Sequence, residues 1–191
     1  MLGSVLKFFQ GELSGYLSQI GVSNSKISFP SYKENRESID FSGDGLNMMI
    51  VNIEEENSVR KADLFKQSND GRSFPALPEI RLNLYLLFVA DLAKYETSID
   101  LLSLVIRYFQ ARRLFTKENS PRLALDYPDI ERLTVELITL PFAQQNEVWN
   151  ALRTSYKPSV LYKIRMIVFT QDDPLIDLQG INTIERQMNN K

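Results

Sequence analysis

The stretch Ile80–Ala90 reads IRLNLYLLFVA, and it decides the fold class. Every second residue from Ile80 to Phe88 is apolar, and polar or aromatic residues stand between them as far as Tyr85. After Tyr85 the intervening residues, Leu87 and Val89, are apolar too. Side chains of a strand alternate between the two faces of a sheet, so a period of two indicates a strand. The sequence therefore predicts a strand here with one face fully buried.

Helical spacing of apolar residues appears in three other places. It predicts helices over residues 1–20, 95–110 and 142–152, and the third of these carries the only tryptophan, Trp149. Gly21 ends the first helix, and Pro141 precedes the third. The second helix has a broad apolar stripe, so we expect it to pack on the sheet.

Further strands are predicted over residues 26–29, 46–53, 130–140 and 159–170. The span 130–140 also fits a helical period, but its β-branched residues favour a strand. In the span 159–170, Lys163 and Arg165 interrupt one face. Between the strands, residues 54–73 indicate a long solvated connection, which ends in Pro75 and Pro78, residues that disfavour helix.

The order of elements is helix, strands, helix, strand, helix, strand, and the length of 191 residues favours one domain. This order predicts an α+β fold, with a mostly antiparallel or mixed sheet and helices packed on one face. A doubly wound parallel sheet is the second choice. We expect the domain to span residues 1–170 and a C-terminal arm to span 171–191. The arm is apolar without a convincing helical arrangement, at Leu175, Ile176, Leu178, Ile181 and Ile184.

Composition excludes many function classes. The chain contains no cysteine and no histidine, so disulfides, thiol nucleophiles, His-dependent triads and Cys or His metal sites are absent. Lys and Arg number 22 against 24 Asp and Glu, so no global charge attracts nucleic acid. The N-terminal segment lacks a signal-peptide pattern, and Leu84–Ala90, the longest apolar run, falls short of the about 20 residues that cross a bilayer. We expect a cytoplasmic protein without its own membrane anchor.

Candidate catalytic residues are few, and each has a simpler explanation. Carboxylates cluster at 54–56, at Asp126, Asp129 and Glu131, and at Asp172 and Asp173. All three clusters lie in loops or at the ends of elements, where carboxylates are more often solvated or capping a helix than engaged in acid–base chemistry. Ser155 and Lys157 are two residues apart, but no oxyanion hole or buried lysine accompanies them. The segment 43–45 is a turn rather than a phosphate loop, and the cations over 107–113 fit a helix end. We expect no enzyme, cofactor or metal site.

Cations within the predicted strands are more informative about function. Arg81, Lys163 and Arg165, together with Arg132, project from the side of their strands opposite the main set of apolar residues. If their strands are neighbours, one sheet face mixes cations with apolar residues. Such a face suits a protein partner, although side chains that snorkel to solvent explain it equally well. The apolar arm also needs a cover, which a partner or its own domain can supply.

The C-terminal half carries a specific motif. Residues 149–163 read WNALRTSYKPSVLYK, a string defined by Trp149, Leu152, Tyr156, Pro158 and Tyr162. It resembles the N-terminal domain of tail-terminator, or cap, proteins of phage-tail-like contractile injection systems of the antifeeding-prophage and virulence-cassette type. The similarity extends to the LNLYLL run at 82–87, to Leu101 and Leu102, and to Met48, Ile50 and Ile53 before the EEEN run at 54–57.

The resemblance covers roughly residues 1–170 and implies a structural protein. Family members form a ring, usually hexameric, on the baseplate-distal end of tube and sheath, where they halt polymerisation; no enzymatic activity or cofactor goes with the family. It implies partners in the sheath and inner tube, and incorporation into the particle. Within the string we expect Trp149 and Tyr162 to pack the last helix on the last strand, and Pro158 to set the turn.

Three hypotheses remain at this point. The first is a tail terminator of a contractile injection system. The second is an adaptor or chaperone for another secreted assembly, which binds transiently. The third is a carboxylate-dependent hydrolase that uses Asp126, Asp129 or Glu131, and it requires a pocket that unites them.

Overall fold

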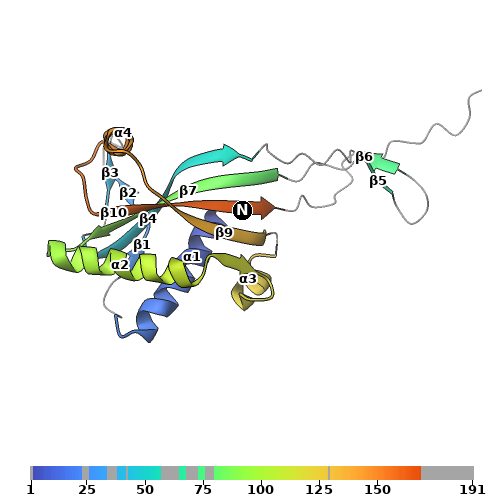
Figure 1. Ribbon diagram of the computed structural model, residues 1–191, viewed down its shortest axis with the longest axis horizontal. Helices are drawn as coiled ribbons and strands as arrows, with labels where there is room; N and C mark the ends of the chain where they lie inside the picture. Colours follow the sequence, from blue (N-terminus) through green and yellow to red (C-terminus); the bar gives the residue numbers. More distant parts are fainter. Residues whose placement is uncertain are drawn as a thin grey trace, which may run out of the picture.

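A six-stranded sheet forms the centre of the molecule in the computed structural model, which describes residues 2–22, 26–33, 38–41, 43–56, 65–67, 73–75, 80–128 and 130–168 (Figure 1). The strand order is β1-β4-β7-β10-β9-β8. Their bounds are β1 Lys26–Ser28, β4 Gly45–Glu55, β7 Ile80–Asp91, β8 Leu114–Thr116, β9 Ile130–Ile138 and β10 Ser159–Val168. Strands β1 and β4 are parallel, and every other neighbouring pair is antiparallel. The predicted α+β class with a mixed sheet is confirmed.

The stretch that predicted the fold is an interior strand of this sheet. Strand β7 pairs with β4 on one side and with β10 on the other. Leu84, Leu86 and Phe88 are almost fully buried on one face, which confirms the period of two. The strand is apolar on both faces toward its end, because Leu87 and Val89 are buried as well.

Two long helices cover the face of the sheet to which Phe88 belongs. Helix α1 (Leu2–Gln19) buries Val5, Phe8, Phe9, Leu13 and Leu17, and α2 (Tyr95–Ala111) buries Leu101, Leu102, Val105, Tyr108 and Phe109. Helix α1 ends before Gly21, whose φ of 80° lies in the left-handed region that glycine tolerates. Both helices were predicted from their periodicity.

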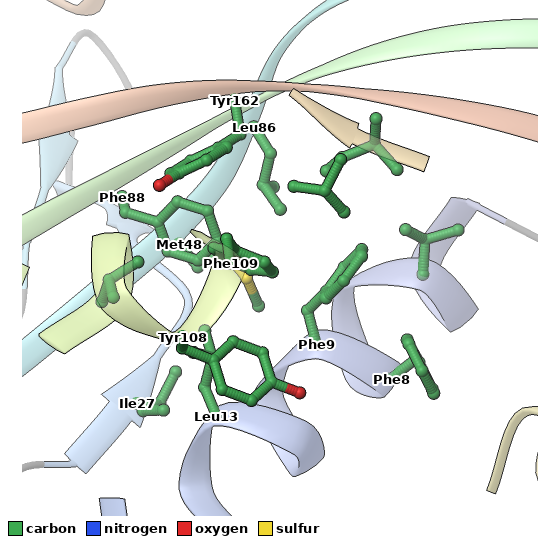
Figure 2. Packing of buried hydrophobic residues seen from close by; sticks show 14 of the residues in the cluster. Phe8, Phe9, Leu13, Ile27, Met48, Leu86, Phe88, Tyr108, Phe109 and Tyr162 are labelled. Carbon is green, nitrogen blue, oxygen red and sulfur yellow. The ribbon is translucent and has the colours of Figure 1, made fainter. Parts of the chain in front are cut away.

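Aromatic rings join these helices to the sheet (Figure 2). The ring of Phe109 lies 5.6 Å from that of Phe9, 5.5 Å from that of Phe88 and 4.8 Å from that of Tyr162. Aromatic pairs at such distances add about 0.5–1.5 kcal/mol each beyond the burial of apolar area. One expectation is wrong: Tyr162 packs here on α2, whereas its strand neighbour Leu161 is the residue that faces the last helix.

Helix α4 (Phe142–Leu152) lies on the opposite face of the sheet (Figure 1). Its Trp149 is 4% exposed and packs with Leu87, Val89 and Leu161, and with Phe41. The expectation that the helices pack on one face therefore holds for α1 and α2 and is corrected for α4. The reason is that β7 and β10 present apolar residues on both faces near one end of the sheet.

The Trp-to-Tyr motif has a structural role at this end. Arg153 ends α4 with a φ of 51°, and the ring of Tyr156 lies 5.4 Å from that of Trp149. The backbone N–H of Ala90 donates to the carbonyl oxygen of Pro158 at 3.0 Å. The motif thus fixes the turn that connects α4 to β10 and aligns β10 with β7.

Several short elements were not predicted. Strand β8 and helix α3 (Pro121–Asp126) lie between α2 and β9. Strands β2 (Ser31–Tyr32) and β3 (Ile39–Asp40) pair with each other, as do β5 (Phe65–Gln67) and β6 (Ser73–Pro75). The interval expected to be an unstructured connection therefore contains a two-stranded sheet. Gly45 begins β4 where it meets β1, and a Cβ there would collide with the carbonyl oxygen of Lys26.

Candidate interaction surfaces

The sheet face that α4 covers at one end carries charged and polar residues farther along its strands. We call this part the mixed-charge face, and its residues include Glu54, Tyr85, Glu136, Lys163 and Arg165. A groove of about 780 Å³ lies between α4 and this face. Its apolar side comes from Leu140, Val148, Leu152 and Leu161, and its polar side from Glu54, Tyr85, Glu136, Lys163 and Arg165. The groove is wide and shallow, which suits a protein surface better than a small molecule.

Strand register brings the predicted cations together. Lys163 lies opposite Tyr85, Arg165 lies opposite Asn83, and Arg81 stands two residues before Asn83 on the same face. Arg132 lies opposite residue 167 and therefore shares this face as well. The expectation that these cations share one sheet face is confirmed.

Carboxylates lie among these cations, and the sequence reasoning missed this arrangement. Lys163 Nζ is 3.9 Å from Glu54 Oε2, and Arg165 donates to Glu136 Oε2 at 3.2 Å. Register provides the explanation, because Glu54 and Glu136 come from the two strands that flank β7 and β10. Glu54, placed by sequence in a solvated run at a strand end, is thus part of the face.

Tyr85 connects the two charge types on the mixed-charge face. Its hydroxyl donates to Glu54 Oε2 at 2.8 Å, and Lys163 Nζ lies 5.5 Å from its ring centre. The hydrogen bond to Glu54 raises the pKa of Tyr85, burial adds to this effect, and the positive charge of Lys163 opposes it. The phenol therefore stays neutral and acts as a donor on this face.

Asn83 is a buried polar group beneath the same face. Its side chain is 3% exposed, and its amide nitrogen donates to Glu56 Oε2 at 2.9 Å. Its carbonyl oxygen has no hydrogen-bond partner among the described residues. This oxygen is itself buried, so it is an internal cost to the fold of about 1–3 kcal/mol rather than a group that a partner can reach.

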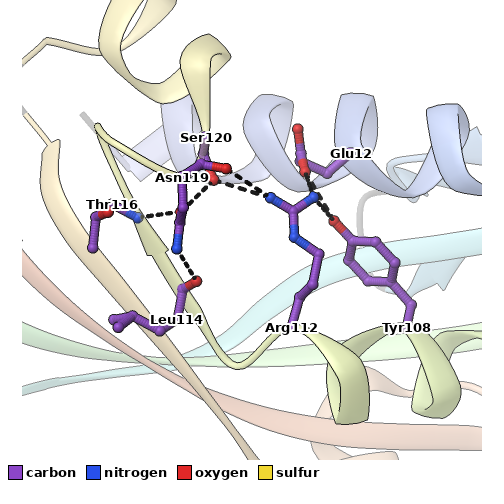
Figure 3. Close-up of polar contacts among 7 residues, drawn as sticks. All are labelled: Glu12, Tyr108, Arg112, Leu114, Thr116, Asn119 and Ser120. Carbon is purple, nitrogen blue, oxygen red and sulfur yellow. Dashed lines mark hydrogen bonds and ion pairs between the residues drawn. The ribbon is translucent and has the colours of Figure 1, made fainter.

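One edge of the sheet, at β8, is closed by a side chain (Figure 3). Asn119 accepts a hydrogen bond from the backbone N–H of Thr116 at 2.9 Å and donates to the carbonyl oxygen of Leu114 at 3.0 Å. The carbonyl of Arg113 accepts from Val135 in β9, so Leu114 and Thr116 point their backbone groups outward. Asn119 thus satisfies the N–H of Thr116 and the carbonyl of Leu114, and the N–H of Ser120 donates to the carbonyl of Thr116 at 3.0 Å, so β8 offers little to an added strand.

A polar network supports this closed edge. Arg112 donates to Glu12 Oε2 at 2.8 Å, to the carbonyl oxygen of Asn119 at 3.2 Å and to Ser120 Oγ at 3.2 Å. The hydroxyl of Tyr108 donates to the same Glu12 oxygen at 2.9 Å. Burial, with the adjacent Glu12 charge, raises the pKa of Tyr108 well above its usual range. The network joins α1, the end of α2 and the turn after β8.

The other edge of the sheet, at β4, is open. Strand β1 pairs only with Gly45, Leu46 and Asn47. No strand among the described residues pairs with the outer side of Met48–Glu55, which forms the upper margin of the sheet in Figure 1. The N–H of Glu56 donates to the carbonyl of Arg81 at 2.8 Å, so the alternating residues Ile53 and Glu55 point their backbone groups outward.

The remaining predicted residues that the structure describes lie apart from one another, in ion pairs or at exposed positions. Lys157 pairs with Asp91 at 2.8 Å, Ser155 is exposed, and Asp126 lies 3.9 Å from Arg122. Asp129 lies outside the described residues. Within the described ranges, no group of three or more Asp or Glu residues is placed to hold a metal ion.

Other predicted features fall outside what the structure describes. Asp172, Asp173 and the apolar residues of the arm follow Val168, where the described chain stops, so their positions are not given. These arm residues are Leu175, Ile176, Leu178, Ile181 and Ile184. None of the helices in the described ranges has both the length and the apolar character needed to span a membrane.

Comparison with known proteins gives a family and a fold. A family model described as the Pvc16 N-terminal domain matches residues 1–176. Among solved structures, the chain is similar to the PVC sheath/tube terminator of an extracellular contractile injection system in its extended state, with 16% sequence identity and a TM-score of 0.61. That match covers 100% of this chain and 65% of the other.

A second solved structure is the anti-feeding prophage cap, the AFP tube-terminating cap. It has 12% sequence identity and a TM-score of 0.60 over 98% of this chain and 62% of the other. The chain thus spans just under two thirds of the length of these two structures. No curated protein matches it. Because the family model matches most of the sequence, the chain belongs to the Pvc16 N-terminal domain family.

Proposed function

We propose that this protein caps the baseplate-distal end of the tube and sheath of a contractile injection system and terminates their polymerisation. The observation that carries the proposal is the family match over residues 1–176, together with a fold similar to two terminator caps. A terminator presents one surface to the end of a polymer and does not repeat it on its far side. We therefore propose a closed ring of copies with head-to-tail contacts, as a hexamer.

The proposed role is structural rather than enzymatic. The similar structures are a sheath/tube terminator and a tube-terminating cap, and the described ion pairs include Asp126, with Arg122, and Lys157, with Asp91. The proposed partners are sheath and inner tube proteins. We propose that the protein folds in the cytoplasm and is then incorporated into the particle, as a domain over 1–170 with an arm over 171–191.

The mixed-charge face and the arm are the proposed contact surfaces. Lys163, Arg165 and Arg81 alternate there with carboxylates, a pattern that selects a partner of complementary charge arrangement. The apolar arm residues Leu175 to Ile184 form the second proposed contact surface, toward a neighbouring copy or the sheath.

Deletion of the gene, followed by negative-stain imaging of the particles, tests the proposal. We expect over-long or uncapped sheaths, and restoration of normal length by the full chain supplied separately. Particles of normal length and normal ends would contradict the capping role. A transient adaptor or chaperone would reduce the yield of particles and would be missing from finished ones, so mass spectrometry of purified particles separates that alternative.

Two variants test the proposed surfaces. Reversal of charge in Lys163→Glu with Arg165→Glu is expected to abolish capping while the isolated protein stays folded, because both side chains lie at the surface of the sheet. Lys94→Glu, at an exposed position beside α2, is the matched control and should cap normally. Truncation after Thr170 is expected to prevent ring formation. Normal rings and capping by the truncated chain would contradict a role for the arm.

A further inference from the structure

The open outer edge of β4 is the feature from which a more specific contact follows. Over Met48–Glu55 this strand has a neighbour on one side only, among the described residues. Beyond the β-bulge between Ile50 and Asn52, its last four residues contain no proline and no lysine; their charged residues are Glu54 and Glu55, and Ile53 is 47% exposed. Such an edge accepts an extended segment through backbone hydrogen bonds.

One outward backbone group of this edge has a local partner. The N–H of Ile53 donates to the side-chain oxygen of Asn52, its own neighbour, at 2.9 Å in an exposed position. Rotation of the Asn52 side chain frees this donor without breaking a bond between strands. The ladder bonds to β7, which use Glu56 and the residues that alternate with it, stay intact.

The opposite edge excludes one way to fill this site. A ring could in principle continue the sheet from one copy to the next by pairing β4 with β8. Asn119 already occupies the outward carbonyl of Leu114 and the outward N–H of Thr116, and β8 has only three residues. The strand that covers β4 must therefore come from another part of the chain or from another protein.

Part of the arm alternates as such a strand would. Over 175–184 the chain reads LIDLQGINTI. In an extended chain Ile176 and Leu178 share one face with residues 180, 182 and 184, and Asp177 and Gln179 share the other with residues 175, 181 and 183. Apolar and polar residues alternate strictly over 176–179. Beside β4, this part would place Ile176 and Leu178 on the side of Ile53, and Asp177 and Gln179 on the side of Asn52 and Glu54.

We propose that residues 175–184 of one copy add as a strand to the outer edge of β4 in the next copy. From Val168 to Leu175 the chain can span about 25 Å when extended, which is enough to leave its own domain. Its own β4 edge lies about 14 Å away, three strand spacings, so reach alone does not select the neighbour. The choice of a second copy rests on the proposed ring, in which each copy offers one surface and receives a different one.

Cysteine cross-linking tests this contact, because the natural chain contains no cysteine. Full-length Ile53→Cys is co-expressed, under a different affinity tag, with each of a set of arm variants: Ile176→Cys, Asp177→Cys, Leu178→Cys, Gln179→Cys and Gly180→Cys. After oxidation we expect covalent dimers that carry both tags. Their yield should alternate with a period of two along the arm, because alternate residues of an added strand face the same side. A control with Tyr95→Cys, an exposed position on α2, should give none.

The other outcomes overturn the inference. Dimers of Ile53→Cys alone would mean that two β4 edges pair with each other. A further variant carries both Ile53→Cys and Leu178→Cys in one chain. A link inside that chain, without mixed dimers in the co-expression, would mean that the arm covers its own domain. Rings that form and cap tails without any cross-link would overturn this contact and leave the proposed function intact. Absence of both rings and capping in the unmodified protein would instead contradict the proposed function.

Discussion

The two edges of the central sheet differ in how their outward backbone groups are satisfied. At β8, the Asn119 amide bonds both Leu114 and Thr116, and Arg112 ties the same turn to α1. At β4, outward groups over Met48–Glu55 face no strand in the described chain. Because one edge of the sheet is open and the opposite edge is closed, contacts made through the sheet edges would be directional. Directional contacts are what a head-to-tail ring requires, whereas two open edges would invite open-ended growth.

The largest expected effect tests the assignment of inward and outward groups in β4. Glu54→Pro removes an N–H that bonds β7 and should lower the free energy of unfolding by about 2–3 kcal/mol. Ile53→Pro removes an outward N–H and should cost under about 1 kcal/mol, because proline is tolerated at sheet edges. Urea denaturation of both variants measures the difference. Equal losses would mean that the edge is assigned wrongly.

Substitution of Asn119, which closes the β8 edge, is expected to have the next largest effect on the free energy of unfolding. Asn119→Ala leaves Leu114 and Thr116 to water and should lower the free energy of unfolding by about 1–2 kcal/mol. Asn119→Asp keeps the acceptor for Thr116 and loses the donor for Leu114, so its loss should be smaller. Thermal unfolding compares them. If the alanine variant is as stable as the natural chain, Asn119 does not close this edge.

Alkaline titration compares the pKa values of two tyrosines, Tyr108 near the closed β8 edge and Tyr85 on the mixed-charge face. Tyr108, beside the closed edge, has a pKa raised mainly by burial, whereas the pKa of the partly exposed Tyr85 is raised mainly by its hydrogen bond to Glu54. A phenol whose pKa is raised in the folded state stabilises the fold below the ordinary tyrosine value of about 10. That stability is lost as pH rises above 10 toward the folded value.

We therefore expect Tyr108→Phe to flatten the alkaline fall in stability and Tyr85→Phe to change it little. Tyrosinate absorbance should also show Tyr85 ionising at lower pH than Tyr108. Tyr162, whose pKa is raised to about 12 by burial, serves as a reference in the same core. Ionisation of Tyr108 before Tyr85 would contradict the packing of the Glu12 network.

The smallest effect on stability is expected on the mixed-charge face. The ion pair between Arg165 and Glu136 has both side chains more than half exposed, so Arg165→Ala should lower the free energy of unfolding by only about 0.2–1 kcal/mol. Chemical denaturation at low and high salt measures it. A loss several times larger would indicate that Arg165 supports the fold rather than serving as a contact residue.

Much of the fold could be predicted from the sequence, because periodicity is a local property. The strand at 80–90 and the helices at 95–110 and 142–152 were each found from apolar spacing. Strand β8 could not be found in this way, because three residues carry no measurable period. The side on which α4 lies depends on which strands are neighbours, and spacing within one strand does not give that order.

The surfaces were predicted in part. The period within each strand placed Lys163 and Arg165 on the face opposite the core, and strand register then added Glu54 and Glu136. The bonds from Asn119 to β8 depend on how the turn at 117–120 returns to the backbone of that strand. In the sequence, the local signal for this turn is an Asn-Ser pair just before the proline that begins α3.

Amide hydrogen exchange tests the difference between the edges most directly. In the full-length ring, the N–H groups of Ile53 and Glu55 are expected to exchange slowly, and truncation after Thr170 should restore fast exchange at both. The N–H of Thr116, already bonded to Asn119, should exchange slowly in both forms. Fast exchange at Ile53 and Glu55 in the assembled full chain would contradict the claim that the open edge of β4 is where copies join.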